Sequence, residues 1–278
     1  MNVKQTSGLK YDKNKYIEVS DNIVVEEGLQ ISLNGTLFTI TMRTPGDDQA
    51  YVRGLLHCEG IVTNNDCEMA FDKGDGTIFA CDHFINVTID ENDIAKDVLP
   101  MRNIVSSSSC GLCGKIKDEE ASDFSVKPKL VPSQLFACES LGPLSSCFEN
   151  TQTLFKKSGG AHGAAAFTID GRLLASAEDI GRHNAVDKVV GRLILEKNIA
   201  TAEMLLVSGR VSYEIIQKAY TAGLVYVVAV SAPSSLAIEL ASARGMTLIG
   251  FCRNGRCTIY SNPHHINQGA AAISVTEC

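Results

Sequence analysis

The sequence predicts an α/β protein, with a layered α/β domain in its second half and a smaller β-rich domain before it. From residue 164 onward, strand-like and helix-like segments alternate along the chain. The run 225–230 is apolar throughout, as expected for a strand buried on both faces. The first hundred residues instead show short alternating patterns around one helix. Such strand–helix repetition is typical of helices packed over a largely parallel sheet.

The expected division of the chain has four parts. They are a flexible leader, a β-rich N-terminal domain, a cysteine loop with its linker, and an α/β domain (residues 1–22, 23–105, 106–130 and 131–278). The charged, proline-ended tract 115–128 marks the linker.

In the β-rich part, Asn34-Gly35 predicts a tight hairpin turn. Asp47 and Asp48 predict the start of a helix that Gly60 ends. Residues 67–89 predict two or three short strands, split at the polar stretch 73–76.

In the second half, residues 133–157 predict a helix in two pieces, interrupted at Gly142-Pro143. The remaining elements alternate. Strands are expected at 164–169, 173–177, 204–207, 225–230, 248–252 and 258–260, and helices at 184–197, 213–221 and 234–244.

Composition excludes several classes of function. The 278 residues carry a net charge of −7, which argues against sequence-independent binding to nucleic acid. No apolar run approaches the roughly 18 residues that span a bilayer, so no membrane segment is expected. The chain begins without an apolar signal sequence and contains ten cysteines. Mostly free thiols in a reducing cytoplasm, rather than a disulfide scaffold, are therefore expected.

The stretch from Ser106 to Gly114 reads Ser-Ser-Ser-Ser-Cys-Gly-Leu-Cys-Gly. Its serines offer no apolar face, and its glycines leave room around the sulfurs of Cys110 and Cys113. Cys-x-x-Cys spacing is one setting that lowers the pKa of a thiol. Redox or sulfur-transfer chemistry, half of a zinc site and a pair of inert thiols all remain open from the motif alone.

A second group of possible zinc ligands lies in the β-rich part (His57, Cys58, Cys67, Cys81 and His83). Their spacings match no compact zinc finger. Cysteines buried as small apolar residues are the favoured interpretation, and no metal site is expected.

Polar residues gather where the predicted strands give way to helices. Ser158 to Gly163 is glycine-rich enough for the N–H groups around Gly159 and Gly160 to bind an anion, with His162 beside them. This stretch lacks the lysine of a nucleotide triphosphatase loop. Ligands of α/β sheets bind beyond the carboxyl ends of the strands, so we expect a binding site here.

Two further junctions repeat this pattern. Arg182 and His183 precede a helix on which Asn184, Lys188 and Arg192 share one face. Helix capping and solvated charge remain an alternative interpretation of that face. Arg210 follows Ser208-Gly209, and the stretch 231–235 is likewise small and hydroxylated.

The stretch Phe251-Cys252-Arg253-Asn254-Gly255-Arg256-Cys257 predicts a hairpin with two arginines flanking an Asn-Gly turn. Seven of the ten arginines lie beyond Phe167, although the chain as a whole is acidic. Arginine forks suit phosphates, so the asymmetry favours a pocket for a phosphorylated small molecule. Cys252 and Cys257 are also explained as simple cross-strand neighbours.

Taken together, these residues resemble the FdhD family of formate dehydrogenase accessory sulfurtransferases. The resemblance runs from about Glu26 to Tyr260. Its matching stretches are 31–35, 43–45, Cys110-Gly-Leu-Cys-Gly114, 159–162, the block Glu178-Asp-Ile-Gly-Arg-His-Asn-Ala-Val-Asp-Lys188, 208–214 and 231–239. Mild departures occur at Ser158, Gly163 and Ser234.

The resemblance implies a sulfur carrier that works as a cytoplasmic homodimer. A cysteine desulfurase would place sulfur on Cys110 as a persulfide, with Cys113 assisting. The sulfur would pass to the molybdenum or tungsten bis(molybdopterin guanine dinucleotide) cofactor before its insertion into formate dehydrogenase. The stretch 251–256 would contact this cofactor, which a guanine nucleotide could mimic. The C-terminal domain would have a cytidine deaminase-like fold.

Two alternatives remain beside this one. The implied fold suggests a zinc-dependent deaminase-like hydrolase, although Ser109 stands before Cys110 and neither His162 nor His183 is followed two residues later by glutamate. A chaperone that binds the cofactor without transferring sulfur is the other. The roles of both histidines are open between hydrogen bonding to the cofactor, shuttling a proton and supporting a helix start.

Overall fold

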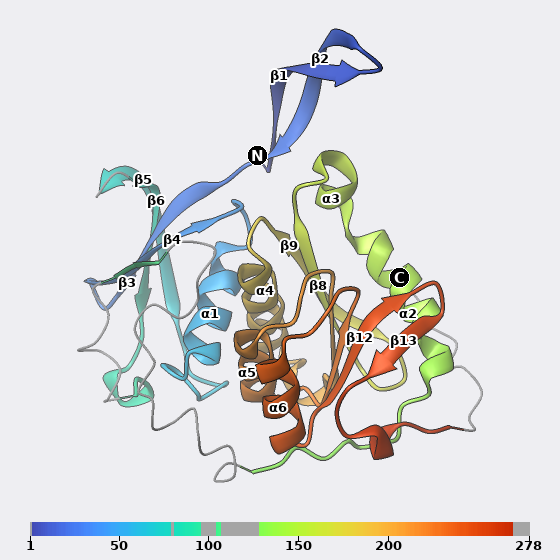
Figure 1. Cartoon of the computed structure of the whole chain (residues 1–278). Helices are drawn as coiled ribbons and strands as arrows, with labels where there is room; N and C mark the ends of the chain where they lie inside the picture. The colour runs from blue at the N-terminus through green and yellow to red at the C-terminus, as the bar shows by residue number, and fades with distance from the viewer. Residues whose placement is uncertain (1, 79–80, 96–103, 107–127, 269–278) are drawn as a thin grey trace.

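A computed structural model describes residues 2–78, 81–95, 104–106 and 128–268. Two sheets and their helices form successive layers, and a separate hairpin projects from one end (Figure 1). The layers are a five-stranded sheet, helix α1, the group α4–α6, a six-stranded sheet, and helix α2. The mixed α/β class is confirmed, whereas the cytidine deaminase-like layering stays a prediction.

The five-stranded sheet has the order β5-β6-β3-β4-β7. Its strands are β3 Glu27–Leu33, β4 Thr36–Arg43, β5 Ala70–Ile78, β6 Cys81–Thr88 and β7 Ile104–Ser106. Apolar side chains of β3 and β6 pack against helix α1, Asp48–Cys58. The predicted turn is confirmed by the positive φ angles of Asn34 (49°) and Gly35 (80°). Asp47 caps α1, and Gly60 follows its end with φ 69°.

The expected split of the strand region at residues 73–76 is wrong, because β5 runs through it. Gly74 lies opposite Phe84 of β6 in the register. A Cβ on Gly74 would stand 2.2 Å from the ring of Phe84. The glycine therefore makes room for an aromatic ring on the neighbouring strand and does not break its own.

The six-stranded sheet has the order β13-β12-β11-β10-β8-β9. Its strands are β8 His162–Phe167, β9 Leu173–Asp179, β10 Met204–Val207, β11 Tyr226–Ala229, β12 Thr247–Arg253 and β13 Arg256–Ile259. Only β10–β11 and β11–β12 pair in parallel. The expectation of a largely parallel sheet is therefore wrong. Tight turns at 170–171 and 254–255 join β8 to β9 and β12 to β13, and such turns force antiparallel pairing.

Helices cover both faces of this sheet. On one face lie α4 Arg182–Leu195, α5 Tyr213–Thr221 and α6 Ser235–Ala243, whereas α2 Leu141–Thr151 packs on the other and leads into α3 Thr153–Ser158. The predicted interruption at Gly142-Pro143 is wrong. Pro143 lies in the first turn of α2, where its missing N–H removes no helical bond. The break falls instead at Gln152, whose ψ is 61°.

Residues 3–24 differ from the expected leader. They form a hairpin of β1 Val3–Asp12 and β2 Lys15–Val24, paired along their whole length. Lys13 and Asn14 have φ angles of 48° and 65°, the left-handed pair that a tight hairpin turn requires. The rings of Tyr11 and Tyr16 lie 5.2 Å apart across the strands. Turn chemistry and this aromatic pair favour a hairpin in a segment whose polarity indicated a leader.

The two sheets are joined through α1 and α4, which pack directly on each other. A glycine stands at the crossing on each helix, Gly54 on α1 and Gly191 on α4, and each faces the backbone of the other helix. The helix pair therefore fixes the N-terminal sheet against the start of α4. None of the described helices is long and apolar enough to cross a membrane.

Candidate functional site

The predicted polar junctions meet along one edge of the six-stranded sheet. Ser208 follows the end of β10, and its hydroxyl accepts a hydrogen bond from the N–H of Gly163 at 2.9 Å. His162, at the start of β8, pairs with Asp179, at the end of β9. The loops after β10 and β11 are joined by a bridge between Val211 and Pro233. The stretch before β8 reaches this edge because β8 runs antiparallel to β10, which brings the start of β8 to the carboxyl end of β10. In the largely parallel sheet that the sequence predicted, the same stretch would lie at the opposite edge.

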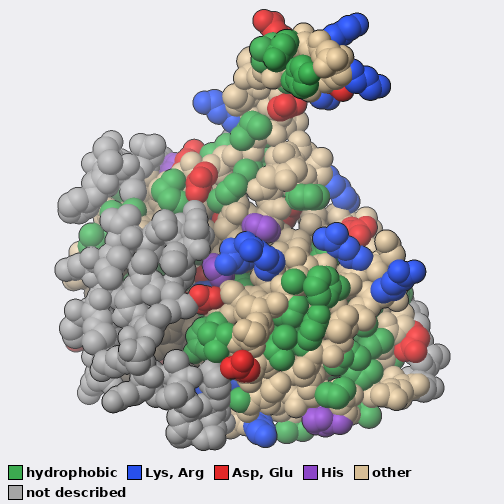
Figure 2. Space-filling model, in the orientation of Figure 1, with side chains coloured by type: hydrophobic (Ala, Val, Ile, Leu, Met, Phe, Trp, Pro, Cys, Tyr) green, Lys and Arg blue, Asp and Glu red, His purple; other side chains and the backbone are tan. Residues whose placement is uncertain are grey.

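His162, Arg182 and Arg210 form the basic part of this edge. A Cβ on Gly209 would lie 3.4 Å from His162 Nδ1 and 3.5 Å from Arg182 Cβ, so this glycine gives both side chains room. Burial lowers the pKa of His162, and the charges of Arg182 and Arg210 lower it further. Figure 2 shows histidine and basic side chains gathered in the middle of this face. The edge therefore combines a neutral imidazole with arginine charge.

His183 opens α4 behind this group and is 6% exposed. Burial lowers its pKa to about 4, and the charges of Arg182 and Lys218 act in the same direction. Its Nε2 lies 3.3 Å from the hydroxyl of Ser212. Within the described residues, His183 Nδ1 and Arg182 Nε are buried without a hydrogen-bond partner. A neutral imidazole with one unused nitrogen can hydrogen-bond a ligand or accept a proton.

The glycine stretch before β8 uses its N–H groups within the chain. Gly159 ends α3 with φ 66°, and its N–H donates to Phe155 O at 2.7 Å. The N–H of Gly160 donates to Ser158 Oγ at 3.2 Å. An anion at this place would have to displace these bonds. The assignment of Gly159 and Gly160 to cofactor binding stays a prediction.

The β12–β13 hairpin lines an open hollow on the surface. The lining residues are Phe251, Arg253, Asn254, Arg256, Cys257 and Thr258. Asn254 and Gly255 have φ angles of 51° and 70°, which confirms the predicted turn. Arg253 is anchored by a 3.2 Å bond from its Nε to Val230 O, at the end of β11. Cys252 differs from its neighbours because it is buried, with Sγ 3.9 Å from Ser145 Oγ.

These two groups share one edge of the sheet. β12, which carries Arg253, lies two strands from β10, which leads into Arg210. Neighbouring strands are about 4.8 Å apart, so the two strand ends are separated by roughly 10 Å. The arginines of the hollow and of the histidine group can therefore act on one large anionic ligand.

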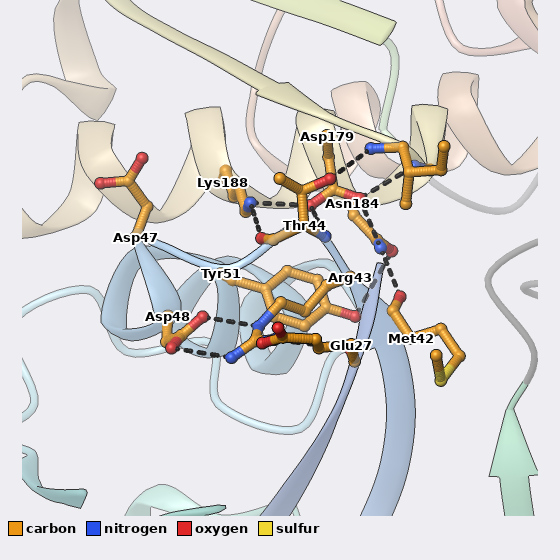
Figure 3. A network of polar contacts seen from close by, with 12 residues as sticks. Glu27, Met42, Arg43, Thr44, Asp47, Asp48, Tyr51, Asp179, Asn184 and Lys188 are labelled. Atoms are coloured by element: carbon orange, nitrogen blue, oxygen red, sulfur yellow. Dashed lines mark hydrogen bonds and ion pairs between the residues drawn. The ribbon is translucent and has the colours of Figure 1, made fainter. Parts of the chain in front are cut away.

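The polar stretch 178–188 spans the end of β9 and the start of α4. Its polarity suggested ligand binding, but its side chains make contacts inside the protein. Asp179 is fully buried and lies at the centre of a polar network (Figure 3). One of its oxygens lies 2.7 Å from Lys188 Nζ and accepts the N–H of Thr44 at 3.0 Å. The other accepts Gly181 N at 2.8 Å and Asn184 Nδ2 at 3.0 Å. A single carboxylate thus organises the start of α4 and holds the end of the strand segment from the other sheet.

The N-terminal half contributes residues 42–44 to this network. Lys188 Nζ donates to Thr44 O at 2.8 Å, and Asn184 Nδ2 donates to Met42 O at 2.9 Å. Arg43 is 1% exposed and pairs with Asp48 through two bonds of 2.9 and 3.2 Å. Figure 3 shows these groups converging between the two halves.

The alternative of solvated charge is therefore wrong for Asn184 and Lys188, which are 5% and 1% exposed. Arg192, the third residue of that face, pairs with Asp47 at 2.7 Å and is partly exposed. Sequence reasoning missed this junction, because its partners lie far apart along the chain. The polar 43–45 and 178–188 stretches, taken as a pair, were the available signal.

Three of the possible zinc ligands of the β-rich part, Cys58, His57 and His83, each have different neighbours. Cys58 is 6% exposed and belongs to the apolar core, as the favoured interpretation predicted. His57 Nε2 lies 3.1 Å from Thr221 O, and His83 Nε2 lies 2.9 Å from Glu27. Among the described residues, no three metal-binding side chains stand close enough to hold an ion.

Cys110 and Cys113 lie outside the described residues. The described chain before them ends with β7, which runs parallel to β4 and places Ser106 beside Thr41. The next residue of β4, Met42, accepts the bond from Asn184 near the start of α4.

These features define a mixed α/β protein with two joined sheets, an arginine–histidine edge on the six-stranded sheet, and a Cys-x-x-Cys motif in its sequence. The sequence model described as the FdhD/NarQ family matches residues 24–267. The chain belongs to the FdhD/NarQ family.

Several relatives are similar along nearly their whole length, and each bears the name "Sulfur carrier protein FdhD". The protein from Streptomyces avermitilis is 40% identical over 261 residues, covering 91% of both chains. The one from Mycobacterium tuberculosis is 39% identical over 88% of this chain and 92% of its own. The one from Picrophilus torridus is 40% identical over 89% of this chain and 93% of its own.

A solved structure supports the fold. It belongs to a Desulfotalea psychrophila protein described as a formate dehydrogenase accessory protein, and it matches with a TM-score of 0.73. The match covers 96% of this chain and all of the other, at 20% sequence identity. At that identity the likeness establishes the shared fold.

Proposed function

We propose that this protein is a sulfur carrier that supports formate dehydrogenase. In this proposal Cys110 receives sulfur as a persulfide from a cysteine desulfurase. The sulfur then passes to the molybdenum or tungsten bis(molybdopterin guanine dinucleotide) cofactor, which is cargo. The observation that carries the proposal is the end-to-end similarity, at about 40% identity, to proteins named as sulfur carriers.

The first step is thiol exchange at sulfur. The thiolate of Cys110 attacks the outer sulfur of the persulfide on the desulfurase cysteine. A new S–S bond forms on Cys110, the old one breaks, and the desulfurase cysteine leaves as a thiolate. The step requires an accessible, ionised thiol, and the glycines at positions 111 and 114 leave space around both sulfurs.

The position of Ser106, the last described residue before Cys110, supports the second step. Ser106 lies beside Thr41, and the strand containing Thr41 continues to the residues that hold the start of α4. His183 and Arg182 stand at that start. His183 has a buried Nδ1 without a hydrogen-bond partner among the described residues, so it can hydrogen-bond a sulfur group brought beside it. Arg182 would stabilise a thiolate at that place.

The arginines of the edge support the assignment of the cargo. A bis-dinucleotide carries several phosphates, and guanidinium groups bind phosphate oxygens in pairs. Arg253 and Arg256 line the hollow, and Arg210 lies toward the histidine group. We assign the guanine nucleotide end to the hollow, with Phe251, which is 51% exposed, available to contact the base.

The experiment that tests the proposal measures sulfur loading and cofactor binding separately. Cys110→Ala should abolish loading by desulfurase and cysteine, abolish activation of formate dehydrogenase, and keep guanine nucleotide binding. Arg256→Gln should weaken nucleotide binding and keep loading. If Cys110→Ala and Cys113→Ala both still activate formate dehydrogenase while Arg256→Gln does not, the protein is a cofactor chaperone and the proposal is wrong.

We further propose that Cys113 assists Cys110, that the chain works as a homodimer, and that it acts in the cytoplasm. Cys113→Ala should retain the persulfide on Cys110 and slow its release, which a single-turnover transfer assay would measure.

A further inference from the structure

Three thiols lie together beneath the β12–β13 hairpin. Cys252 and Cys257 come from the hairpin, and Cys138 comes from the 3₁₀ turn Cys138–Ser140 that leads into α2. All three belong to the apolar cluster between α2 and the six-stranded sheet. None of them forms a disulfide in the structure. Their interpretation as cross-strand neighbours therefore leaves Cys138 unexplained.

Within this cluster, Cys138 and Cys257 form a pair. Cys138 lies close enough to Cys257 for that neighbour to contribute to the raised pKa of the Cys138 thiol. Both are partly exposed, and Cys257 lines the hollow. Cys252 is only 5% exposed, and its sulfur contacts the hydroxyl of Ser145. A reagent in the hollow can thus reach Cys257 directly and Cys138 behind it, whereas Cys252 is shielded.

The hollow also favours anionic reagents over uncharged ones. Arg253 and Arg256 are exposed and line it together with Cys257. Guanidinium groups attract carboxylates, and a concave wall concentrates that field on the nearby thiol. Small anionic thiol reagents should therefore accumulate next to Cys257.

We propose that Cys138 and Cys257 form a reactive thiol pair, which small anionic disulfides entering the arginine-lined hollow oxidise to an internal disulfide. The pair joins the β12–β13 hairpin to the turn before α2, and its oxidation does not depend on sulfur transfer at Cys110. It adds a redox-sensitive modification site to the wall of the hollow.

The reaction is two successive thiol–disulfide exchanges. The thiolate of Cys257 attacks one sulfur of the reagent, whose S–S bond breaks, and one reagent thiolate leaves and takes a proton from water. Cys138 then loses its proton to water and attacks the sulfur of Cys257, which releases the second reagent thiolate. Two protein thiols are oxidised, and one reagent disulfide is reduced to two thiols.

The order of attack follows from access to the two thiols. Cys257 lines the hollow, whereas Cys138 is not among its lining residues, so a reagent in the hollow meets Cys257 first. Burial raises the pKa of Cys138 to about 12, which further disfavours Cys138 as the first nucleophile. Cys257 is thus the attacking thiol and Cys138 the resolving one.

The test uses the reduced full-length protein and oxidised glutathione, with alkylation of the remaining thiols and peptide mass mapping. Cutting after Glu139 separates Cys138 from Cys147, and cutting after Tyr260 separates Cys257 from Cys278. A link between Cys138 and Cys257, reversed by dithiothreitol, is expected in the wild type and in Cys252→Ser. A link to Cys252, or no link between Cys138 and Cys257, would overturn the proposal.

Three variants test the order and the charge. In Cys138→Ser, glutathione should remain bound to Cys257, whereas in Cys257→Ser neither a link nor an adduct at Cys138 should form. The double variant Arg253→Gln/Arg256→Gln should react at least about threefold more slowly with oxidised glutathione, and within about twofold of wild type with uncharged hydroxyethyl disulfide. An adduct on Cys138 in Cys257→Ser contradicts the order, and equal rates for the anionic reagent contradict the role of the arginines.

Discussion

Gly54 of α1 and Gly191 of α4 cross with their backbones in direct contact. A Cβ on Gly54 would stand 1.8 Å from Asp187 O, and one on Gly191 would stand 1.7 Å from Ala50 O. No real Cβ approaches a backbone oxygen so closely. The distance between the two halves of the molecule therefore depends on both positions remaining glycine.

Alanine at Gly54 or Gly191 should push α1 and α4 apart. Overpacking of a tight contact typically costs about 1–3 kcal/mol, and a backbone clash of this size belongs at the upper end or beyond. The free energy of unfolding, measured by urea denaturation, should therefore fall by about 3 kcal/mol or more. Gly142→Ala in α2 is the matched control, since a Cβ there meets nothing within 4 Å. Equal stability of Gly54→Ala and Gly142→Ala would show that the crossing is not as close as described.

The junction network should be sensitive to one carboxylate. Asp179→Asn leaves the buried ammonium of Lys188 without its 2.7 Å counter-charge, and breaking a buried pair in this way costs about 3–5 kcal/mol. Asp47→Asn removes the exposed partner of Arg192 and should cost at most about 1 kcal/mol. Urea denaturation of the two variants measures the difference.

A double variant tests whether the loss comes from the stranded charge. Asp179→Asn with Lys188→Met removes both members of the pair, so it should recover part of the stability lost in Asp179→Asn alone. If the two losses simply add, Lys188 and Asp179 do not act as a pair.

His183 should make stability depend on pH. Its pKa is about 4 in the folded protein, against about 6.5 for an ordinary histidine. The unfolded chain therefore binds a proton more readily, and stability falls as the pH drops from above 6.5 toward 4. A shift of this size corresponds to roughly 3 kcal/mol.

His183→Gln should remove the part of the pH dependence of stability that comes from His183 between pH 7 and pH 5. The midpoint of urea denaturation, measured at each pH, follows this change. Arg172→Gln, at an exposed residue of the same half, is the control and should keep the wild-type profile. Identical profiles for wild type and His183→Gln would contradict the burial of a neutral imidazole at the start of α4.

The hollow should bind phosphates through its arginines. Arg253→Gln and Arg256→Gln should each weaken binding of guanosine diphosphate, measured by calorimetry, by about tenfold, since a hydrogen bond to a charged group contributes about 1.5–3 kcal/mol. Arg172→Gln removes an exposed arginine beside the β8–β9 turn and should bind as the wild type does. Unchanged affinity in both hairpin variants would place the nucleotide elsewhere.

The sequence predicts elements best where local chemistry dictates them. Met204–Val207 and Tyr213–Thr221 have the predicted bounds, because a buried apolar run and an amphipathic helix are read from neighbouring residues. The turn at 254–255 follows from the Asn-Gly dipeptide alone. Hairpin 3–24 was missed because its side chains are mostly polar and exposed, so no apolar pattern distinguishes it from a leader.

The site was predicted only in part. The loops after β10 and β11 lie at one edge because these strands are parallel, as strand–helix repetition predicts. The stretch before β8 joins that edge because β8 is antiparallel to β10, which the sequence pattern did not indicate. The role of Asp179 was not predicted, because its bond to Thr44 joins residues 135 positions apart. Asp179 and Lys188 stand in a polar stretch for which ligand contact or solvated charge was expected. They become a structural junction only when the two halves are packed together.

The central claim is that Cys110 carries sulfur. Purified protein should be incubated with a cysteine desulfurase and cysteine, and peptides containing Cys110 and Cys113 should then be weighed by mass spectrometry without reductant. The account predicts an added mass of about 32 Da, one sulfur atom, on Cys110, which dithiothreitol removes. It predicts the same adduct in Cys113→Ala and none in Cys110→Ala. An unmodified Cys110 in protein that activates formate dehydrogenase would contradict the account.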